Sequence, residues 1–261
     1  MKEETLASGM RVWSASPDGA GPFPSAIIFH ERRGPVAHTF RMAERMTQEG
    51  FAAFVPDFFH RYTEPRGPVE AAEIRVEMPD EDTLTDYDEL VEYIDTLSFA
   101  DADRVVAAGF CQTGRTPLVI ASHRSNLSGA IVFHGGIYPR DFDAIGRGEE
   151  AVTGLVTRVT CPVLGAFGEL DELVPLPNVW AFRDMLEKNR KSFQIRLFPG
   201  TPHSWMDVSN DRYREEAAAQ AWQLLGEFSR AVTSDAWNRD QLIFRFESGV
   251  KADQTFLPAA S

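Results

Sequence analysis

The sequence predicts a single α/β domain, built on a mostly parallel sheet with helices on both faces. Three observations favour this fold class. Short apolar runs alternate with longer amphipathic stretches along the chain, as they do in a series of β-α units. Several short runs are apolar at every position, as strands covered on both faces must be. The length of 261 residues suits one such domain.

The expected strands are the short apolar runs bounded by turn residues. They are Ala26–Phe29, Ala52–Val55, Val105–Gly109, Ala130–Phe133, Val163–Phe167 and Gln194–Phe198. The helical patterns between them are His38–Glu49, Leu84–Thr96, Pro117–Ser122, Val179–Asn189 and Tyr213–Ala231. Arg66–Met78 has no clear periodicity and is expected to form a lid or mouth loop. In an open parallel sheet the active site forms at the carboxyl ends of the strands, so residues that directly follow these strands are the first candidates for chemistry.

The end of the chain stands apart from this alternation. We assign residues 1–232 to the main domain and residues 233–261 to a C-terminal extension. Gln241–Glu247 (QLIFRFE) reads as a strand, although the helix before it looks like the end of the domain. The alternatives are a simple ordered extension, an added strand that pairs with an edge of the sheet, and an arm that reaches the second subunit of a homodimer.

The chain is acidic, with 26 Lys and Arg against 39 Asp and Glu and a formal net charge of −13. Nucleic acids and anionic membranes repel such a chain, so we expect neither as a partner. No segment approaches the ~20 apolar residues of a membrane span, and the start MKEETLASGM lacks the basic and apolar regions of a signal peptide. We therefore expect a cytoplasmic protein whose cysteines, Cys111 and Cys161, are free thiols.

The position of Cys111 predicts a nucleophile. An apolar strand leads into it through Gly109, and a helix is expected to begin at Gly114 or the next residue. A nucleophile on such a tight strand-to-helix turn projects above the sheet beside the N-terminal amides of the helix, and a helix N-terminus lowers the pKa of a thiol. The usual turn has glycine two residues before and two after the nucleophile, whereas here Thr113 takes the second place. A lone buried cysteine is more often inert, and this is how we interpret Cys161.

Two polar residues that follow later strands complete a catalytic triad. Asp171 comes just after Val163–Phe167, and His203 lies on a Gly- and Pro-bounded loop after Gln194–Phe198. A nucleophile needs a base, the base needs an orienting group, and α/β hydrolases carry them in the order nucleophile, acid, histidine. Either residue alone is more often a turn or surface residue. Together with Cys111, each past its own strand, they predict an α/β-hydrolase fold.

The remaining histidines do not form a metal-binding motif. His30, beside Glu31, and His134, before two glycines, end strands on the same rim, and each is a candidate for lining the site. The other three, which we expect to be structural or exposed, are His38, His60 and His123. No HExxH sequence or close-spaced pair of ligands is present, so we expect no metal ion.

At these residues the chain resembles the dienelactone hydrolase family (carboxymethylenebutenolidases), from about Ile27 to Ala231. The resemblance rests on FHERRG at 29–34, GFAAFVPD at 50–57, GFC at 109–111, DELVP at 171–175 and HSW at 203–205. It implies a Cys111–His203–Asp171 triad that needs no cofactor. The activity that we expect is hydrolysis of lactones or activated enol esters, small-molecule substrates that would form a thioester with the cysteine.

The resemblance also implies roles for residues outside the triad. The family glutamate that matches Glu31 contacts the resting thiol and helps to deprotonate it when substrate binds. The oxyanion hole would consist of the backbone N–H groups of Arg32 and Gln112, donors that typically contribute ~3 kcal/mol each. Candidates for substrate binding are Arg33, Arg75, Arg115 and Trp205.

One position departs from the enzymes that open dienelactone. An arginine a few residues after their histidine helps to bind the substrate carboxylate, and Asp207 stands at that place here. An acid there repels a carboxylate, so we expect a neutral lactone or enol ester to be the better substrate. The alternative function is a non-catalytic binding or scaffold protein that keeps the fold, and the unusual Gln112-Thr113 sequence after the cysteine is the feature that favours it.

Overall fold

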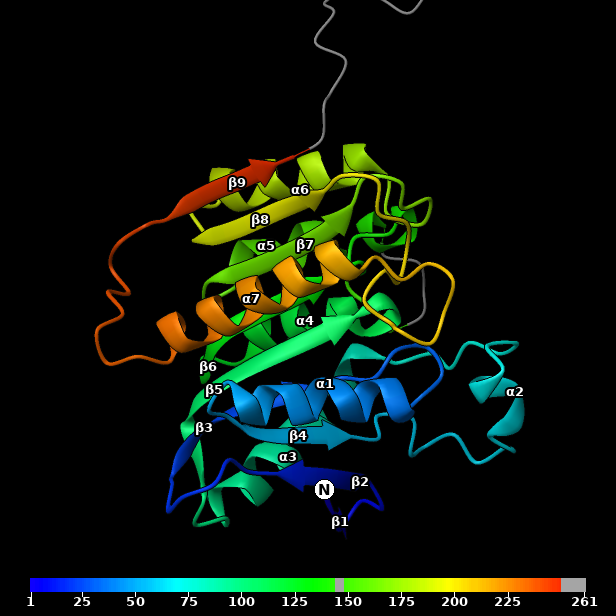
Figure 1. Cartoon of the computed structure of the whole chain (residues 1–261), viewed down its shortest axis with the longest axis vertical. Helices are drawn as coiled ribbons and strands as arrows, with labels where there is room; N and C mark the ends of the chain where they lie inside the picture. Colours follow the sequence, from blue (N-terminus) through cyan, green and yellow to red (C-terminus); the bar gives the residue numbers. More distant parts are fainter. Residues whose placement is uncertain (144–147, 250–261) are drawn as a thin grey trace, which may run out of the picture.

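The computed structural model describes residues 1–143 and 148–249, and within them it confirms the α/β-hydrolase fold (Figure 1). The described strands form one nine-stranded sheet in the order β1-β2-β4-β3-β5-β6-β7-β8-β9. They are β1 (Lys2–Thr5), β2 (Arg11–Ala15), β3 (Phe23–Ile28), β4 (Ala52–Pro56), β5 (Ala100–Phe110), β6 (Leu127–Phe133), β7 (Val163–Gly168), β8 (Phe193–Phe198) and β9 (Phe244–Ser248). Every neighbouring pair from β4 to β9 is parallel, whereas β2 runs antiparallel to β1 and β4.

Helices cover both faces of the sheet, as parallel strands require of their crossover connections. The helices are α1 (Ala37–Gln48), α2 (Gly67–Glu70), α3 (Asp80–Asp95), α4 (Thr116–His123), α5 (Val152–Arg158), α6 (Leu176–Lys188) and α7 (Glu215–Val232). In Figure 1, α1 and α7 lie in front of the sheet, and α3, α4, α5 and α6 lie behind it. Each face has its own apolar cluster, because successive strand side chains point to opposite faces.

Some elements have no signal in the apolar pattern. β1 lies at the edge of the sheet and all four of its residues are exposed, so its sequence KEET shows no alternation. β2, with five residues, and α5, with seven, are also short. The segment expected to form a lid or mouth loop, Arg66–Met78, contains the single helical turn α2.

The strand expected at Gln241–Glu247 forms at Phe244–Ser248 and pairs in parallel with β8. This pairing makes β9 the last strand of the sheet, which is the second of the three alternatives for this segment. The rest of the expected extension, residues 250–261, lies outside the described residues. In the part of the chain that the structure describes, no helix has both the length and the apolar character to cross a bilayer.

Candidate active site

Cys111 lies on the sharp turn between β5 and α4. Its backbone φ is +51°, an uncommon conformation for a residue other than glycine that is often found at functional sites. The chain then makes a 3₁₀ turn over Cys111–Arg115 before α4 begins. A Cβ atom on Gly109 would lie 2.1 Å from the carbonyl oxygen of Thr113, and one on Gly135 would lie 1.8 Å from that of Cys111. Both glycines are therefore steric requirements of the turn.

Thr113, the departure from the usual motif, stabilises this turn. Its hydroxyl accepts a hydrogen bond from the backbone N–H of Phe110 at 3.1 Å and lies 3.1 Å from the carbonyl oxygen of the same residue. The tight approach to the turn after β6 falls one residue later, where a Cβ on Gly114 would lie 2.7 Å from the carbonyl carbon of Gly135. The threonine is thus compatible with the turn because the glycine requirement has moved to the next position.

The three expected triad residues meet at the carboxyl ends of their strands. Nε2 of His203 lies 3.1 Å from Sγ of Cys111, and Nδ1 of His203 lies 2.8 Å from Oδ2 of Asp171. The other carboxylate oxygen of Asp171 accepts hydrogen bonds from the backbone N–H groups of Leu173 and Val174 at 2.9 and 3.1 Å. All three triad residues are buried, so only a small part of the network is exposed to solvent.

The surroundings favour a charged His203. Burial alone lowers the pKa of an imidazole, but hydrogen bonds to Asp171 and Cys111 outweigh it and raise the pKa of His203 to about 10. An imidazolium between a carboxylate and a sulfur atom stabilises the sulfur as a thiolate. The arrangement can therefore supply a nucleophile paired with its own proton donor.

Glu31 lies at the edge of this network in an environment that disfavours its charge. Burial raises the pKa of Glu31 to about 7, against an opposing effect of the positive charge on His203. Its Oε1 lies 3.6 Å from Nε2 of His134, and both atoms are buried without a hydrogen-bond partner. The resemblance implies a contact between this glutamate and the resting thiol, whereas the described hydrogen bonds of the thiol go to His203 and Tyr138.

His30 and His134 are buried behind the site and support it. Nε2 of His30 accepts a hydrogen bond from the backbone N–H of Phe58 at 3.1 Å, so Nδ1 carries the proton and donates to the carbonyl oxygen of Glu31 at 2.9 Å. The ring of His134 packs edge-on against that of His203 at 5.1 Å. Burial lowers the pKa of both His30 and His134, so neither ring carries a charge that competes with His203.

Tyr138 is a site residue that the sequence analysis does not include. Its hydroxyl lies 3.6 Å from Sγ of Cys111, and its ring lies 6.3 Å from that of His203. It follows the turn after β6, in which His134 and Gly136 have positive φ values. A tyrosine shortly after the carboxyl end of a central strand is the only sequence signal for this residue.

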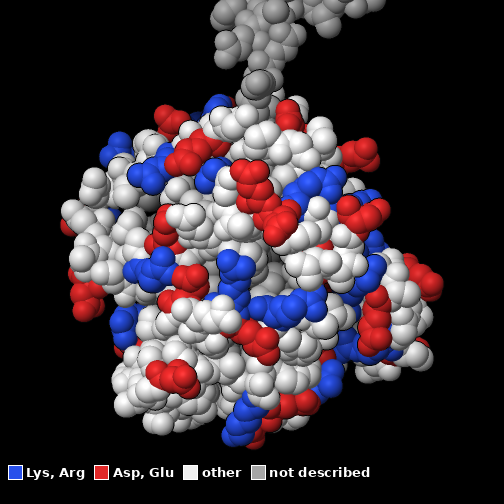
Figure 2. Space-filling view, in the orientation of Figure 1, with Lys and Arg blue, Asp and Glu red and all other residues white. Residues whose placement is uncertain are grey.

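A cleft of about 600 Å³ opens above the thiol. Cys111, His203 and Glu31 form part of its floor, and residues from the Arg66–Met78 segment and α1 form part of its rim. The rim carries both signs of charge, with Arg32, Arg33, Arg41 and Arg212 beside Glu70, Asp207 and Asp211. Acidic and basic side chains are also interspersed over the face of the molecule in Figure 2, so the net charge of −13 does not form one acidic surface there.

Asp207 is already paired within this cleft. Its Oδ1 lies 3.4 Å from the guanidinium of Arg41 and 3.5 Å from Nδ1 of His38. It also accepts hydrogen bonds from the backbone N–H and hydroxyl of Ser209 at 2.9 and 2.7 Å. Asp207 thus lines the cleft, but its charge is partly compensated by these partners.

The structure contradicts two of the four expected substrate contacts. Arg115 is buried and pairs with Asp80 through two hydrogen bonds, so its guanidinium is not available in the cleft. Trp205 is fully buried and packs against His134 and Phe198, with ring centroids 5.2 and 5.5 Å away.

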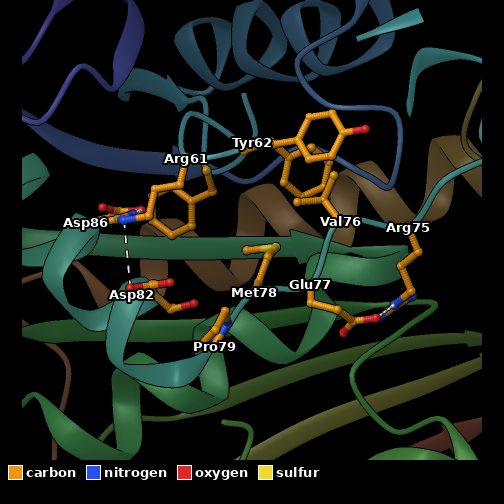
Figure 3. Close-up of a pocket in the computed structure, with 12 residues that line it drawn as sticks. Arg61, Tyr62, Arg75, Val76, Glu77, Met78, Pro79, Asp82 and Asp86 are labelled. Carbon is orange, nitrogen blue, oxygen red and sulfur yellow. Dashed lines mark hydrogen bonds and ion pairs between the residues drawn. The ribbon is translucent and has the colours of Figure 1, made fainter. Parts of the chain in front are cut away.

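Of the other two expected contacts, only Arg33 lines the cleft. Arg75 lines a neighbouring cavity of about 300 Å³ and points toward Glu77 there, at 3.7 Å (Figure 3).

The two residues expected to form the oxyanion hole also hold the mouth segment in place. The side-chain amide of Gln112 donates to the carbonyl oxygen of Val76 at 2.5 Å, and the guanidinium of Arg32 donates to that of Ala72 at 2.7 Å. These bonds fix the rim of the cleft to the two turns whose backbone N–H groups are the candidate oxyanion donors.

Among the described residues, neither Cys161 nor a group of metal-ligating side chains offers a second site. Cys161 is buried, and burial raises its pKa to about 12, as expected of an inert thiol. Within residues 1–143 and 148–249, no three histidine, cysteine or acidic side chains are grouped as metal ligands.

A cysteine, an acid and a histidine that follow one another in this order along the chain, at the carboxyl ends of this sheet, define the class of α/β-hydrolase-fold enzymes that cleave carboxylic esters. The chain belongs to the dienelactone hydrolase family, whose model matches residues 10–232.

Similar proteins agree with this assignment. A protein of Escherichia coli O157:H7 that carries the name carboxymethylenebutenolidase is 25% identical over 212 residues, covering 80% of this chain and 77% of its own. A Bradyrhizobium protein named for 2-oxo-3-(5-oxofuran-2-ylidene)propanoate lactonase activity is 26% identical over 213 residues, covering 80% and 84%. The crystal structure of a Klebsiella pneumoniae protein named as a dienelactone hydrolase aligns with a TM-score of 0.80 and 25% identity, over 87% of this chain and 97% of that one.

Proposed function

We propose that the protein hydrolyses lactones or activated esters, with Cys111 as the nucleophile and a thioester as the intermediate. The observation that carries the proposal is the pair of hydrogen bonds that links Cys111 to His203 at 3.1 Å and His203 to Asp171 at 2.8 Å. A thiol bonded to an oriented histidine, at a strand-to-helix turn above a cleft, is the arrangement that nucleophilic acyl transfer requires.

The proposed acylation begins from the thiolate. Sγ of Cys111 forms a bond to the carbonyl carbon, and the π electron pair moves to the carbonyl oxygen, where the backbone N–H groups of Arg32 and Gln112 stabilise the negative charge. When the pair returns, the bond to the leaving oxygen breaks and this oxygen takes the proton from the His203 imidazolium. The acyl group remains on sulfur as a thioester.

The proposed deacylation uses water as the second nucleophile. His203, now neutral and held by Asp171 in the tautomer with Nδ1–H, accepts a proton from water as the water oxygen attacks the thioester. The C–S bond then breaks and its electron pair returns to Cys111 as the thiolate. Glu31 is proposed to assist in forming the thiolate, because burial raises its pKa to about 7 and so makes proton exchange feasible near neutral pH.

The chemistry and the cleft both point to small activated acyl substrates. In enol esters and in lactones with a stabilised leaving oxygen, this oxygen departs without strong acid assistance. Such substrates suit a thiolate nucleophile. The cleft volume of about 600 Å³ lies in the ordinary range for small-molecule sites, and a similar Bradyrhizobium protein is named as a lactonase. Arg33 is the proposed substrate contact at the rim, since it is the expected contact that lines the cleft.

Replacement of each cysteine tests the nucleophile. Cys111→Ala removes only the sulfur, so hydrolysis of a p-nitrophenyl ester is expected to fall to the uncatalysed rate while the fold is retained. Cys161→Ala is the matched control, because this second buried cysteine lies outside the cleft, and it should keep nearly full turnover. An active Cys111→Ala enzyme beside an inactive Cys161→Ala enzyme would reverse the assignment.

Thiol alkylation distinguishes the enzyme from a non-catalytic protein that keeps the fold. If Cys111 is paired with a charged His203, iodoacetamide should label it at pH 6 as well as at pH 9. Labelling that appears only near the reference thiol pKa of ~8.5 would instead support the non-catalytic reading.

A further inference from the structure

We infer that Tyr138 is a catalytic residue, which donates a hydrogen bond to the Cys111 thiolate and promotes departure of the thiolate when the thioester is hydrolysed. The inference rests on the proposed function, since it assigns a step to the same nucleophile. Its starting point is the hydroxyl of Tyr138, which lies 3.6 Å from Sγ of Cys111. That distance is suitable for an O–H···S hydrogen bond, which is longer than its oxygen counterpart because sulfur is larger.

The turn after β6 is built to bring Tyr138 against the thiol. Gly135 and Gly136 allow this turn to pass close to the nucleophile, because Cβ atoms there would lie 1.8 Å from the carbonyl oxygen of Cys111 and 2.6 Å from the backbone of Gly114. The backbone N–H of Tyr138 donates to Oδ2 of Asp141 at 2.8 Å. The backbone of Tyr138 is therefore held by the packing of this turn and by the hydrogen bond to Asp141, and its side chain extends from there to the thiol.

The single hydroxyl proton of Tyr138 has two acceptors. One is Sγ of Cys111, and the other is the carbonyl oxygen of His134 at 3.5 Å. An ionised acceptor makes a stronger hydrogen bond than a neutral one. The hydroxyl is thus expected to donate to the carbonyl oxygen while sulfur is protonated or acylated, and to the sulfur whenever it carries a negative charge.

Tyr138 keeps its proton throughout. Burial and the neighbouring Cys111 hold the pKa of Tyr138 well above its usual range, so the phenol remains a donor at any pH at which the enzyme works. It moves no proton to the substrate, and the proton balance of both half-reactions stays with His203 and water. Its contribution is to stabilise negative charge on one atom.

This contribution affects the two half-reactions differently. In acylation, a hydrogen bond to the thiolate raises the thiolate fraction but reduces the nucleophilicity of each thiolate, and the two effects partly cancel. In deacylation, water forms a C–O bond, the C–S bond breaks, and the electron pair moves to Sγ. A better-stabilised thiolate leaves faster, so Tyr138 should matter most in this second step.

Other titratable groups lie around the thiol. His203 comes from the loop after β8, and Glu31 and His134 come from the ends of β3 and β6. Asp171 acts through His203 from the loop after β7. Removal of the Tyr138 hydroxyl alone leaves all four in place, so the variant isolates one donor.

The first experiment measures the pH dependence of Cys111 alkylation by iodoacetamide in the whole protein. Tyr138→Phe should raise the pH midpoint by about one unit, a tenfold loss of thiolate at a given acidic pH. Tyr87→Phe is the matched control, because the hydroxyl of Tyr87 is bonded to Asn126 at 2.9 Å, on the far side of the sheet from α1. The control should leave the midpoint unchanged, and an unchanged midpoint in Tyr138→Phe would overturn the inference.

The second experiment separates the half-reactions with a p-nitrophenyl ester at a pH above both midpoints. For Tyr138→Phe we expect the burst of p-nitrophenol to stay within about threefold of the wild-type rate, while the steady-state rate falls about tenfold and the thioester accumulates in the mass spectrum. A variant with wild-type deacylation would overturn the assigned step. A wild-type protein that forms no thioester would overturn the proposed function instead, and the alkylation experiment would still test the hydrogen bond.

Discussion

The carboxyl group of Glu31 should make the folded protein less stable as pH rises, and Glu31→Gln should remove this cost. Burial raises the pKa of Glu31 from 4.5 to about 7. At 1.36 kcal/mol per pKa unit, this difference corresponds to a penalty of ~3 kcal/mol for the charged form. The side chain is only 16% exposed, so screening by solvent reduces the figure little.

The sign of the effect follows from proton binding in the two states. Below pH 4.5 Glu31 is protonated in both folded and unfolded protein, and it contributes no pH dependence. Between pH 4.5 and 7 the folded protein keeps a proton that the unfolded chain has released, so this group lowers the free energy of unfolding as pH rises. Above pH 7 the full penalty of ~3 kcal/mol applies.

Urea denaturation at pH 4.5, 6 and 8 provides the assay. Glu31→Gln is expected to match the wild type at pH 4.5 and to exceed its free energy of unfolding by ~3 kcal/mol at pH 8, with a loss of turnover at both. A gain of this size raises the melting temperature by roughly 6–12 °C in a chain of this length. Stability gained at the expense of activity is the usual result when a buried charge serves catalysis.

The matched control is Glu172→Gln, an exposed glutamate on the loop that carries Asp171. It should change the free energy of unfolding little at any of the three pH values. If Glu31→Gln gives no stabilisation at pH 8, or the same stabilisation at pH 4.5 and pH 8, the argument that burial disfavours the Glu31 carboxylate is refuted.

Two further predictions concern the acids of the site. Asp171→Asn keeps the shape of the side chain but loses the acceptor that fixes the His203 tautomer, so kcat should fall by about 10⁴. Steady-state kinetics that show less than a tenfold loss of kcat would contradict this role of Asp171. A neutral lactone or enol ester should give a higher kcat/KM than its carboxylate-bearing analogue. Asp207→Asn should reduce the ratio of these two kcat/KM values by up to about fivefold, because it removes a partly compensated charge and releases Arg41. A wild-type preference for the anion, unchanged in Asp207→Asn, would point instead to Arg33 as the carboxylate partner.

The fold and the triad could be predicted because their signals are local in the sequence. A buried parallel strand is apolar at every position, and β4, β6 and β7 are buried at every position in the structure. Residues just past such strands meet at one edge of the sheet, which brings Cys111, Asp171 and His203 together without knowledge of any side-chain direction.

The directions of the other side chains could not be predicted, because they depend on contacts between distant segments. Arg115 lies four residues after Cys111, but Asp80 at the start of α3 turns its guanidinium away from the cleft. Trp205 lies two residues after His203, but the positive φ of Ser204 between them reverses the chain and buries the indole. Tyr138 reaches the thiol only because the turn after β6 packs on the Cys111 turn.

The Gln112-Thr113 sequence shows that the glycines of this motif reflect a steric constraint, which a different sequence can also satisfy. The second glycine of the usual turn is needed because a backbone segment passes too close for a Cβ atom. In this chain that close approach occurs at Gly114, while the buried Thr113 closes the turn through its hydroxyl and the backbone of Phe110. The same constraint is therefore met one residue later, with the thiol still facing His203 at 3.1 Å. The Gln112-Thr113 sequence therefore no longer favours a non-catalytic protein, because it leaves the contact between Cys111 and His203 intact.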